Sequence, residues 1–260
     1  MILRWNEIDQ IMKSNTNMTV AVLLSSLLGL TQLSSSYSIR GVNDCDKSVY
    51  FHILTASGSV NTTVAAVHPG ESTTFSLDVN PLSQLSVWTL WISDDPTANV
   101  GPSSSTGSLV EMTTDLRLNT SFVDISNVNA LTNSWTVVPD VLCKTSSNTS
   151  CDIIACNPRS DWVCPYANRV VPNQMTNFTK PNQPYLSEQQ VCMSNCTLTN
   201  SFQDCCTGPN STAATCSNTS PSLKEACPAA YSWAYDDAAA IRRWEIGMIE
   251  GPIATLRACS

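Results

Sequence analysis

Charged residues are scarce in this sequence, and cations are scarcer than anions. Only 13% of the 260 residues are charged, and 13 Lys and Arg stand against 21 Asp and Glu, for a formal net charge of −8. Proteins that bind nucleic acid depend on cations that replace phosphate counterions, so we expect no nucleic-acid partner. The 12 cysteines, an even number, are typical of an oxidising compartment and argue against a cytosolic enzyme.

Histidine and the common catalytic motifs are almost absent. The only histidines are His52 and His68, and both lie outside the cysteine-rich part of the chain. A zinc site with Cys and His ligands, or a Ser–His–Asp triad, would depend on one of them. The sequence also has no G-x-S-x-G nucleophile elbow, no P-loop and no G-x-G-x-x-G motif. We therefore expect no metal site and no cofactor.

Long apolar runs are missing as well. The most apolar segment, residues 20–30, is well short of the ~20 residues that a membrane span needs. It suits the hydrophobic core of a signal peptide, for which Lys13 supplies the positive charge if translation starts at Met12. We expect a signal peptide over residues 1–36, with a signal anchor as the alternative, and no other membrane span. The protein is then secreted to the extracellular space or cell wall.

Asn-x-Ser/Thr sequons are frequent beyond the apolar segment, which supports passage through the secretory pathway. We exclude the sequon of Asn195, because its middle residue is Cys196, which we expect to form a disulfide. The sequons predicted to be glycosylated begin at Asn61, Asn119, Asn148, Asn177, Asn210 and Asn218.

Residues 37–142 contain short runs in which apolar and polar residues alternate, separated by turn residues. This pattern predicts an antiparallel sandwich or barrel. The predicted strands are Ser48–Leu54, Thr63–Val67, Ser72–Val79, Leu85–Ile92 and Ser121–Ile125. Residues 143–227 hold ten of the cysteines and predict a loop-rich lobe held by disulfides, with a short helix at Ser220–Ala226. Residues 228–260 are expected to return to the sandwich.

The most distinctive part of the sequence is its cysteine-rich region. The stretch Asp204–Asp237 reads DCCTGPNSTAATCSNTSPSLKEACPAAYSWAYDD, and it is preceded by Cys156 and Cys164, eight residues apart, and by Cys192 and Cys196, four residues apart. Further upstream lie Leu109–Val110–Glu111 and the segment VDISNV at residues 123–128. With these elements the chain resembles the thaumatin-like (osmotin) family over most of residues 45–237. It is more similar to fungal members than to plant members.

The resemblance implies a mainly β fold: a flattened antiparallel β-sandwich with an inserted disulfide-rich loop domain and a cleft between the two. It also implies the disulfides Cys45–Cys259, Cys156–Cys227, Cys164–Cys192, Cys196–Cys205 and Cys206–Cys216. Cys143 and Cys151 are left over and can close a short loop together, Cys143–Cys151. Spacing alone does not fix this connectivity.

The sequence departs from the family pattern in two places. Residues 46–142 lack cysteines where the family usually has further disulfides. After Asp237 the family continues briefly to a cysteine on a strand, whereas here residues 238–247 intervene. This segment is either a retained intron or a divergent strand, and it leaves the pairing of Cys45 with Cys259 open.

Members of the family carry an acidic cleft that binds β-1,3-glucan, and some hydrolyse it weakly. The resemblance places Glu111, Asp124 and Asp236 in this cleft. In glycoside hydrolysis one carboxylic acid protonates the leaving oxygen while a second carboxylate acts as base or nucleophile. Glu111 is then expected as the acid, Asp124 as the base or electrostatic partner, and Asp236 across the cleft. The alternative for each residue is a purely structural role.

Two cleft positions differ from the family. Asn129 replaces an acidic residue, and Leu90 or Ser93 replaces an arginine. Sugar hydroxyls bond to Asn as readily as to Asp, whereas hydrolysis depends more strongly on the lost groups. We therefore predict that the protein binds β-1,3-glucan with weak or no hydrolysis, and we expect it to be a monomer. The alternatives are an endo-β-1,3-glucanase that uses Glu111 and Asp124, and a defence or effector protein without carbohydrate chemistry. Candidates for stacking on sugar rings are Trp88, Trp91, Trp135 and Trp233.

Overall fold

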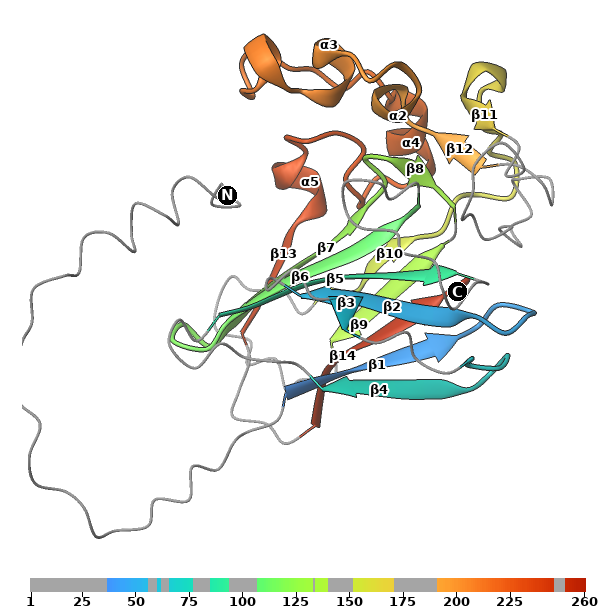
Figure 1. The fold of residues 1–260 in the computed structure, drawn as a ribbon, viewed down its shortest axis with the longest axis vertical. Coiled ribbons are helices and arrows are strands. Elements are labelled where there is room, and N and C mark those ends of the chain that lie inside the picture. The colour runs from blue at the N-terminus through green and yellow to red at the C-terminus, as the bar shows by residue number, and fades with distance from the viewer. Residues whose placement is uncertain are drawn as a thin grey trace, which may run out of the picture. The chain divides into compact units, whose positions relative to one another are not determined.

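Two large β-sheets form the centre of the structure, which is a computed structural model (Figure 1). The structure describes residues 37–55, 60–61, 66–76, 85–93, 107–132, 134–139, 152–170, 191–245 and 251–260. All of them belong to one compact unit, Ser36–Ser260. The expected signal peptide and the Cys143–Cys151 pair lie outside the described residues. In the described part of the chain, no helix has the length and hydrophobicity needed to cross a bilayer.

The larger sheet is antiparallel throughout, in the strand order β13-β7-β6-β5-β2-β3. Its strands are β2 (Tyr50–Thr55), β3 (Val60–Asn61), β5 (Leu85–Ser93), β6 (Leu109–Asp115), β7 (Thr120–Ser126) and β13 (Arg242–Glu245). The runs predicted at Ser48–Leu54, Leu85–Ile92 and Ser121–Ile125 are therefore strands, in agreement with the alternation of their residues. Of the run predicted at 63–67, Val67 forms an isolated bridge with Val49.

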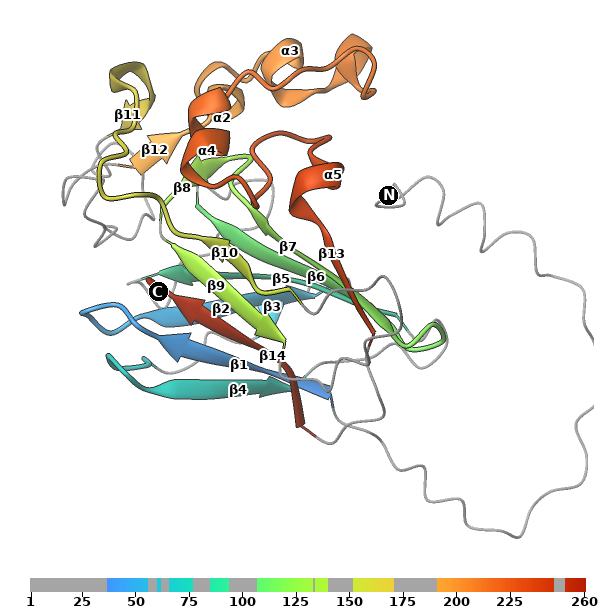
Figure 2. The ribbon, with the colours of Figure 1, turned by 180° about the vertical axis from the view of Figure 1, so that it is seen from behind.

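The second sheet has the order β10-β9-β14-β1-β4, which Figure 2 shows from its outer side. Its strands are β1 (Tyr37–Asn43), β4 (Ser72–Ser76), β9 (Trp135–Pro139), β10 (Ile154–Cys156) and β14 (Gly251–Ala258). The first and last of these, β1 and β14, are parallel to each other, and the remaining pairs are antiparallel. The mainly antiparallel sandwich expected from the sequence is confirmed, with this one parallel pair as an addition.

One hydrophobic core fills the space between the two sheets. Leu90, Val110 and Ile125 from the larger sheet and Ile39 and Leu256 from the smaller sheet belong to it, and all are fully buried. Along β5 every second residue (88, 90, 92) faces this core, as a period of two requires. The alternate residues of β5, β6 and β7 lie on the opposite face of the larger sheet.

A lobe of short elements lies at one end of the sheets (Figures 1 and 2). A three-stranded sheet of β11 (Arg169–Val170), β12 (Val191–Met193) and β8 (Ala130–Leu131) connects it to the sandwich. The remaining elements are η1 (Tyr166–Asn168), α2 (Asn195–Thr199), α3 (Phe202–Cys205), η3 (Gly208–Asn210), α4 (Pro221–Ala226) and α5 (Asp237–Ala240). Helix α4 confirms the helix predicted at Ser220–Ala226, with Pro at its first position.

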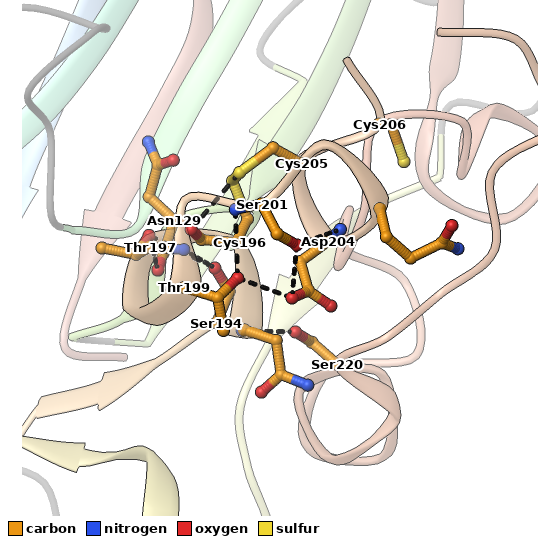
Figure 3. Close-up of a disulfide and its surroundings, with 12 residues drawn as sticks. Asn129, Ser194, Cys196, Thr197, Thr199, Ser201, Asp204, Cys205, Cys206 and Ser220 are labelled. Atoms are coloured by element: carbon orange, nitrogen blue, oxygen red, sulfur yellow. Dashed lines mark hydrogen bonds between the residues drawn. A yellow bond between two sulfur atoms is a disulfide. The ribbon is translucent and has the colours of Figure 1, made fainter. Parts of the chain in front are cut away.

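Hydrogen bonds around the Cys196–Cys205 disulfide show how such short helices persist (Figure 3). The Ser201 hydroxyl accepts a bond from the backbone N–H of Asp204 and caps α3. In return, the Asp204 carboxylate accepts bonds from the hydroxyls of Thr199 and Ser201 at 2.5 and 2.8 Å. These bonds lower the pKa of Asp204 below its usual value. Local capping and the disulfide thus replace the apolar packing that a longer helix would have.

The structure contains the disulfides Cys45–Cys259, Cys156–Cys227, Cys164–Cys192, Cys196–Cys205 and Cys206–Cys216. These are the pairs that the resemblance implies. Residues 238–245, which interrupt the family pattern, form the rest of α5 and the edge strand β13 beside β7. Strand β14 leads to Cys259, which pairs with Cys45, so the pairing left open by the sequence is present in the structure.

Candidate functional site

The structure brings Glu111 and Asp124 together on one face of the larger sheet. They are directly opposite each other on the neighbouring strands β6 and β7. Their neighbours Val110 and Ile125 point into the core, so the two carboxyl groups lie on the opposite face. Directly opposite residues in an antiparallel pair have Cβ atoms about 4.5–5.5 Å apart. The two acidic residues face each other because a single hairpin, with its turn at residues 116–119, joins β6 to β7.

Both carboxyl groups are held away from bulk water, although to different degrees. Glu111 is half-buried, and its pKa is raised by burial, while a hydrogen bond with the side chain of Ser126 opposes the increase. Asp124 is only 5% exposed. Its pKa lies well above the usual value, first because of burial and then because of the negative charges of Glu111 and Asp237. Within the described part of the chain, Asp124 Oδ1 has no hydrogen-bond partner.

A third carboxyl group approaches the pair from the segment after Cys227. Asp237 accepts a 2.6 Å hydrogen bond from the hydroxyl of Tyr231. The backbone of Tyr231 is fixed at the end of β7, because its N–H donates to Ile125 and its carbonyl accepts from Asn127, both at 2.8 Å. Burial, and then the bond to Asp237 and the nearby carboxyl groups, raise the pKa of Tyr231. The tyrosine thus links the segment carrying Asp237 to the strand carrying Asp124.

Asp236, which the resemblance places across the cleft, has a different environment. Its Oδ2 accepts a 2.8 Å bond from the ammonium group of Lys224 and bonds from the N–H and hydroxyl of Ser232. With 9% exposure and three donors at one oxygen, its carboxylate holds α4 against the following turn. The residue of this element that interacts with Asp124 is its neighbour, Asp237. Sequence reasoning missed Asp237, and the adjacent Asp236–Asp237 pair is the only signal that pointed to it.

Most of the tryptophans expected to stack on sugar rings are buried in the structure. Trp88 and Trp91 are 2% and 4% exposed, so neither ring offers a free face to a sugar in this structure. Trp88 lies in the main core, and Trp91 stacks on His52 at a centroid distance of 5.4 Å on the other face of β5. Trp135 is also fully buried. Trp233 is half-buried and packs edge-on against Tyr235.

Asn129 contributes its backbone to the junction between the sandwich and the lobe. Its carbonyl accepts bonds from the N–H of Ser194 at 2.9 Å and the hydroxyl of Thr197 at 2.7 Å. Its side chain is half-buried. Of the two positions considered for the missing arginine, Leu90 lies in the core and Ser93 bonds to His52. Among the described residues, none of the ion pairs includes Glu111, Asp124 or Asp237.

The predicted glycosylation sites differ in their surroundings. Asn119 is exposed in the turn between β6 and β7, with a left-handed φ of 47°. Asn210 is half-buried at the end of η3. The amide of Asn218 bonds to Ser232 and to the backbone of Ser220. Asn148, Asn177 and the side chain of Asn61 lie outside the described residues.

Comparison with known proteins agrees with this architecture. Residues 97–248 match the model of the Thaumatin family. The chain is 31% identical over 132 residues to thaumatin-like protein 1 of Castanea sativa, which covers 50% of this chain and 47% of that protein. The chain therefore spans about half the length of this curated relative.

Among solved structures, the protein elicitor MoHrip2 from Magnaporthe oryzae is similar at 12% identity and a TM-score of 0.32, over 46% of this chain and 77% of that one. A likeness this weak adds nothing to the assignment, which depends on the sequence match alone. Because the family model covers more than half of the 260 residues, the chain belongs to the thaumatin family.

Proposed function

We propose that this protein is a secreted, N-glycosylated member of the thaumatin family that binds β-1,3-glucan at Glu111 and Asp124, with weak or no hydrolysis. Family membership and the disulfides support secretion. The observation that carries the binding proposal is the Glu111–Asp124 pair: Glu111 is half-buried and so partly accessible, and Oδ1 of the buried Asp124 opposite it has no hydrogen-bond partner among the described residues. An unsatisfied buried polar group costs about 1–3 kcal/mol, and a sugar hydroxyl that bonds to it recovers this cost.

Weak turnover follows from the environment of the same pair. A hydrolase needs one carboxyl group protonated and the other ionised, and usually further groups that fix their separation. Here, among the described residues, no cation forms an ion pair with either carboxyl group. The site therefore has donors and acceptors for a sugar but little to stabilise charge that develops during bond cleavage.

Hydrolysis remains the second candidate because of one specific observation. Retaining glycosidases have carboxyl groups about 5–5.5 Å apart, and directly opposite residues on neighbouring strands have Cβ atoms at a similar separation. The placement of Glu111 opposite Asp124 is thus compatible with this geometry. The two candidates differ in whether reducing ends are released.

The test is co-sedimentation of the purified glycoprotein with insoluble β-1,3-glucan, alongside an assay of reducing ends released from the soluble polymer. We expect Glu111→Ala or Asp124→Ala to weaken binding about tenfold, the effect of losing about 1.4 kcal/mol. The control is Asp161→Asn, an exposed carboxylate in a surface ion pair with Arg159, which should bind as the native protein does. Unchanged binding by both alanine variants would refute the proposed site. Reducing-end release that Glu111→Gln abolishes would favour the hydrolase.

A further inference from the structure

The two carboxyl groups of the Glu111–Asp124 pair are not equally supplied with hydrogen bonds. Glu111 is half-buried, so water can still donate hydrogen bonds to part of its carboxyl group, and the nearby Ser126 side chain opposes the rise of its pKa. Asp124 is nine-tenths buried or more, and its Oδ1 has no donor among the described residues. A carboxylate that accepts a hydrogen bond is stabilised in its charged form, whereas an unsolvated one is not. This unequal supply of hydrogen bonds makes Asp124 the less favourable of the two positions for a negative charge.

The groups that surround Asp124 reinforce this asymmetry. Glu111 faces it from β6, and Asp237 and the Tyr231 hydroxyl face it from the segment after Cys227. On the other side of β7, the edge strand β13 carries two arginines. Arg242 donates to the carbonyls of Ala239 and Ile241, and Arg243 donates to Thr120. Their guanidinium groups are therefore directed to oxygens other than those of Asp124.

A negative charge on one carboxyl group disfavours ionisation of the residue directly opposite it, which is why paired carboxyl groups commonly share one proton. Asp237 adds a third negative charge near Asp124, and the hydrogen bond from Tyr231 keeps that carboxylate in place. The tyrosine is itself fixed to the backbone of β7. The charge of Asp237 therefore acts on Asp124 from a defined position.

Building on the proposed function, we propose that Asp124 holds the proton of the pair at neutral pH and donates it in a hydrogen bond to the ligand, while Glu111 accepts one. Asp237 is a positioning residue that keeps the proton on Asp124 through its charge. This assignment reverses the roles expected from the sequence, in which Glu111 is the acid. It also restricts the ligand to a neutral polysaccharide, because a uronate or carboxymethyl group would meet the negative charges of Glu111 and Asp237.

The first test locates the proton without any ligand. Infrared spectra of protein labelled with ¹³C-carboxyl aspartate, recorded across a pH series, distinguish a protonated aspartic acid from aspartates. We expect one protonated band at neutral pH that Asp124→Asn removes and Asp161→Asn leaves unchanged. Glu111→Gln and Asp237→Asn should each move its titration to lower pH by about one unit or more, because each removes a negative charge. If Asp237 has only a structural role, Asp237→Asn should leave the pH at which this band titrates unchanged.

The second test examines the ligand. Binding of native protein to β-1,3-glucan should decline as the pH rises through the titration of the Asp124 band, whereas Asp124→Asn, whose amide still donates, should bind without this pH dependence. Carboxymethylated β-1,3-glucan should bind at least about tenfold more weakly than the unmodified polymer. If the spectra show no protonated aspartic acid at neutral pH, the proton assignment is wrong, whether or not the protein binds glucan. A protonated Asp124 without glucan binding at any pH would instead overturn the proposed function.

Discussion

The sandwich and the lobe of this protein are stabilised in different ways. In the sandwich, large side chains such as Trp88, Trp135 and Leu90 are buried between two sheets. In the lobe, Phe202 and Tyr166 are 63% and 88% exposed, and four disulfides between described residues connect segments too short to bury a core of their own. The comparison teaches that the lobe is ordered by covalent closure of loops, whereas the sandwich is ordered by removing apolar surface from water.

The largest effect should come from the disulfide that attaches the lobe to the sandwich. Cys156 on β10 and Cys227 after α4 are separated by 71 residues, and both are buried. On the chain-entropy relation, closing a loop of this length contributes about 4 kcal/mol. We expect the double substitution Cys156→Ala/Cys227→Ala to lower the free energy of unfolding by about this amount in urea denaturation.

A shorter disulfide within the lobe is the control for this prediction. Cys196 and Cys205 are only 9 residues apart, and the same relation gives about 2.6 kcal/mol. The corresponding double alanine variant should lose less stability than the variant that lacks Cys156–Cys227. Equal losses would show that loop closure is not what orders the lobe.

In the sandwich, the loss of stability should depend on which face of a strand carries the substitution. Leu90 on β5 is fully buried, whereas Val87 on the other face of the same strand is 40% exposed. We expect Leu90→Ala to cost about 3 kcal/mol, from lost transfer free energy and a cavity, and Val87→Ala about 0.5 kcal/mol or less. Thermal and urea unfolding measure both. A large loss from Val87→Ala would mean that its face is also a packed interface.

Much of this architecture follows from local patterns. Alternation of residues along β5 and β7 defines strands, and Pro221 after Ser220 defines the start of α4. Other features depend on distant parts of the chain. The parallel pairing of β1 with β14 joins Tyr37 to Gly251, and no local pattern announces it. Disulfide pairing was available only through the family resemblance, because spacing permits many connectivities.

The candidate site was predictable in part for the same reason. Period two places Glu111 and Asp124 on one face once their strands are paired, and the hairpin pairs them directly. The burial of Trp91 was not visible, because the sequence does not show that His52 stacks on its ring across the strand. Neither was the choice between Asp236 and Asp237, since adjacent residues at the start of α5 point in different directions.

That choice gives the next prediction, on two adjacent residues of the lobe segment. Asp236→Asn removes the charge that pairs with the partly buried Lys224, so we expect the free energy of unfolding to fall by about 2 kcal/mol. Asp237→Asn leaves an amide oxygen that still accepts from Tyr231, and should change stability by about 0.5 kcal/mol or less at neutral pH. Chemical denaturation of the two variants is the measurement. The reverse order would place the structural role on Asp237.

The last prediction is a pH dependence that separates the buried pair from the surface of the sandwich. Because the pKa of Asp124 is raised in the folded protein, the folded state holds a proton that the unfolded chain releases from its ordinary pKa upward. The free energy of unfolding should therefore fall as the pH rises through the window between these two pKa values, by about 1.4 kcal/mol per pH unit, and level off above it.

The contribution of Asp115, at the end of β6, changes with pH in the opposite direction, because the bond from Arg117 lowers the pKa of Asp115. Its contribution is present above its ordinary pKa and is lost as the pH falls through the lowered one. Urea denaturation from mildly acidic to mildly alkaline pH should show the decline in native protein and in Asp115→Asn, and a flatter profile in Asp124→Asn. If the decline persists unchanged in Asp124→Asn, another group holds the proton, and the buried pair does not differ from its surroundings in its effect on the pH dependence of stability.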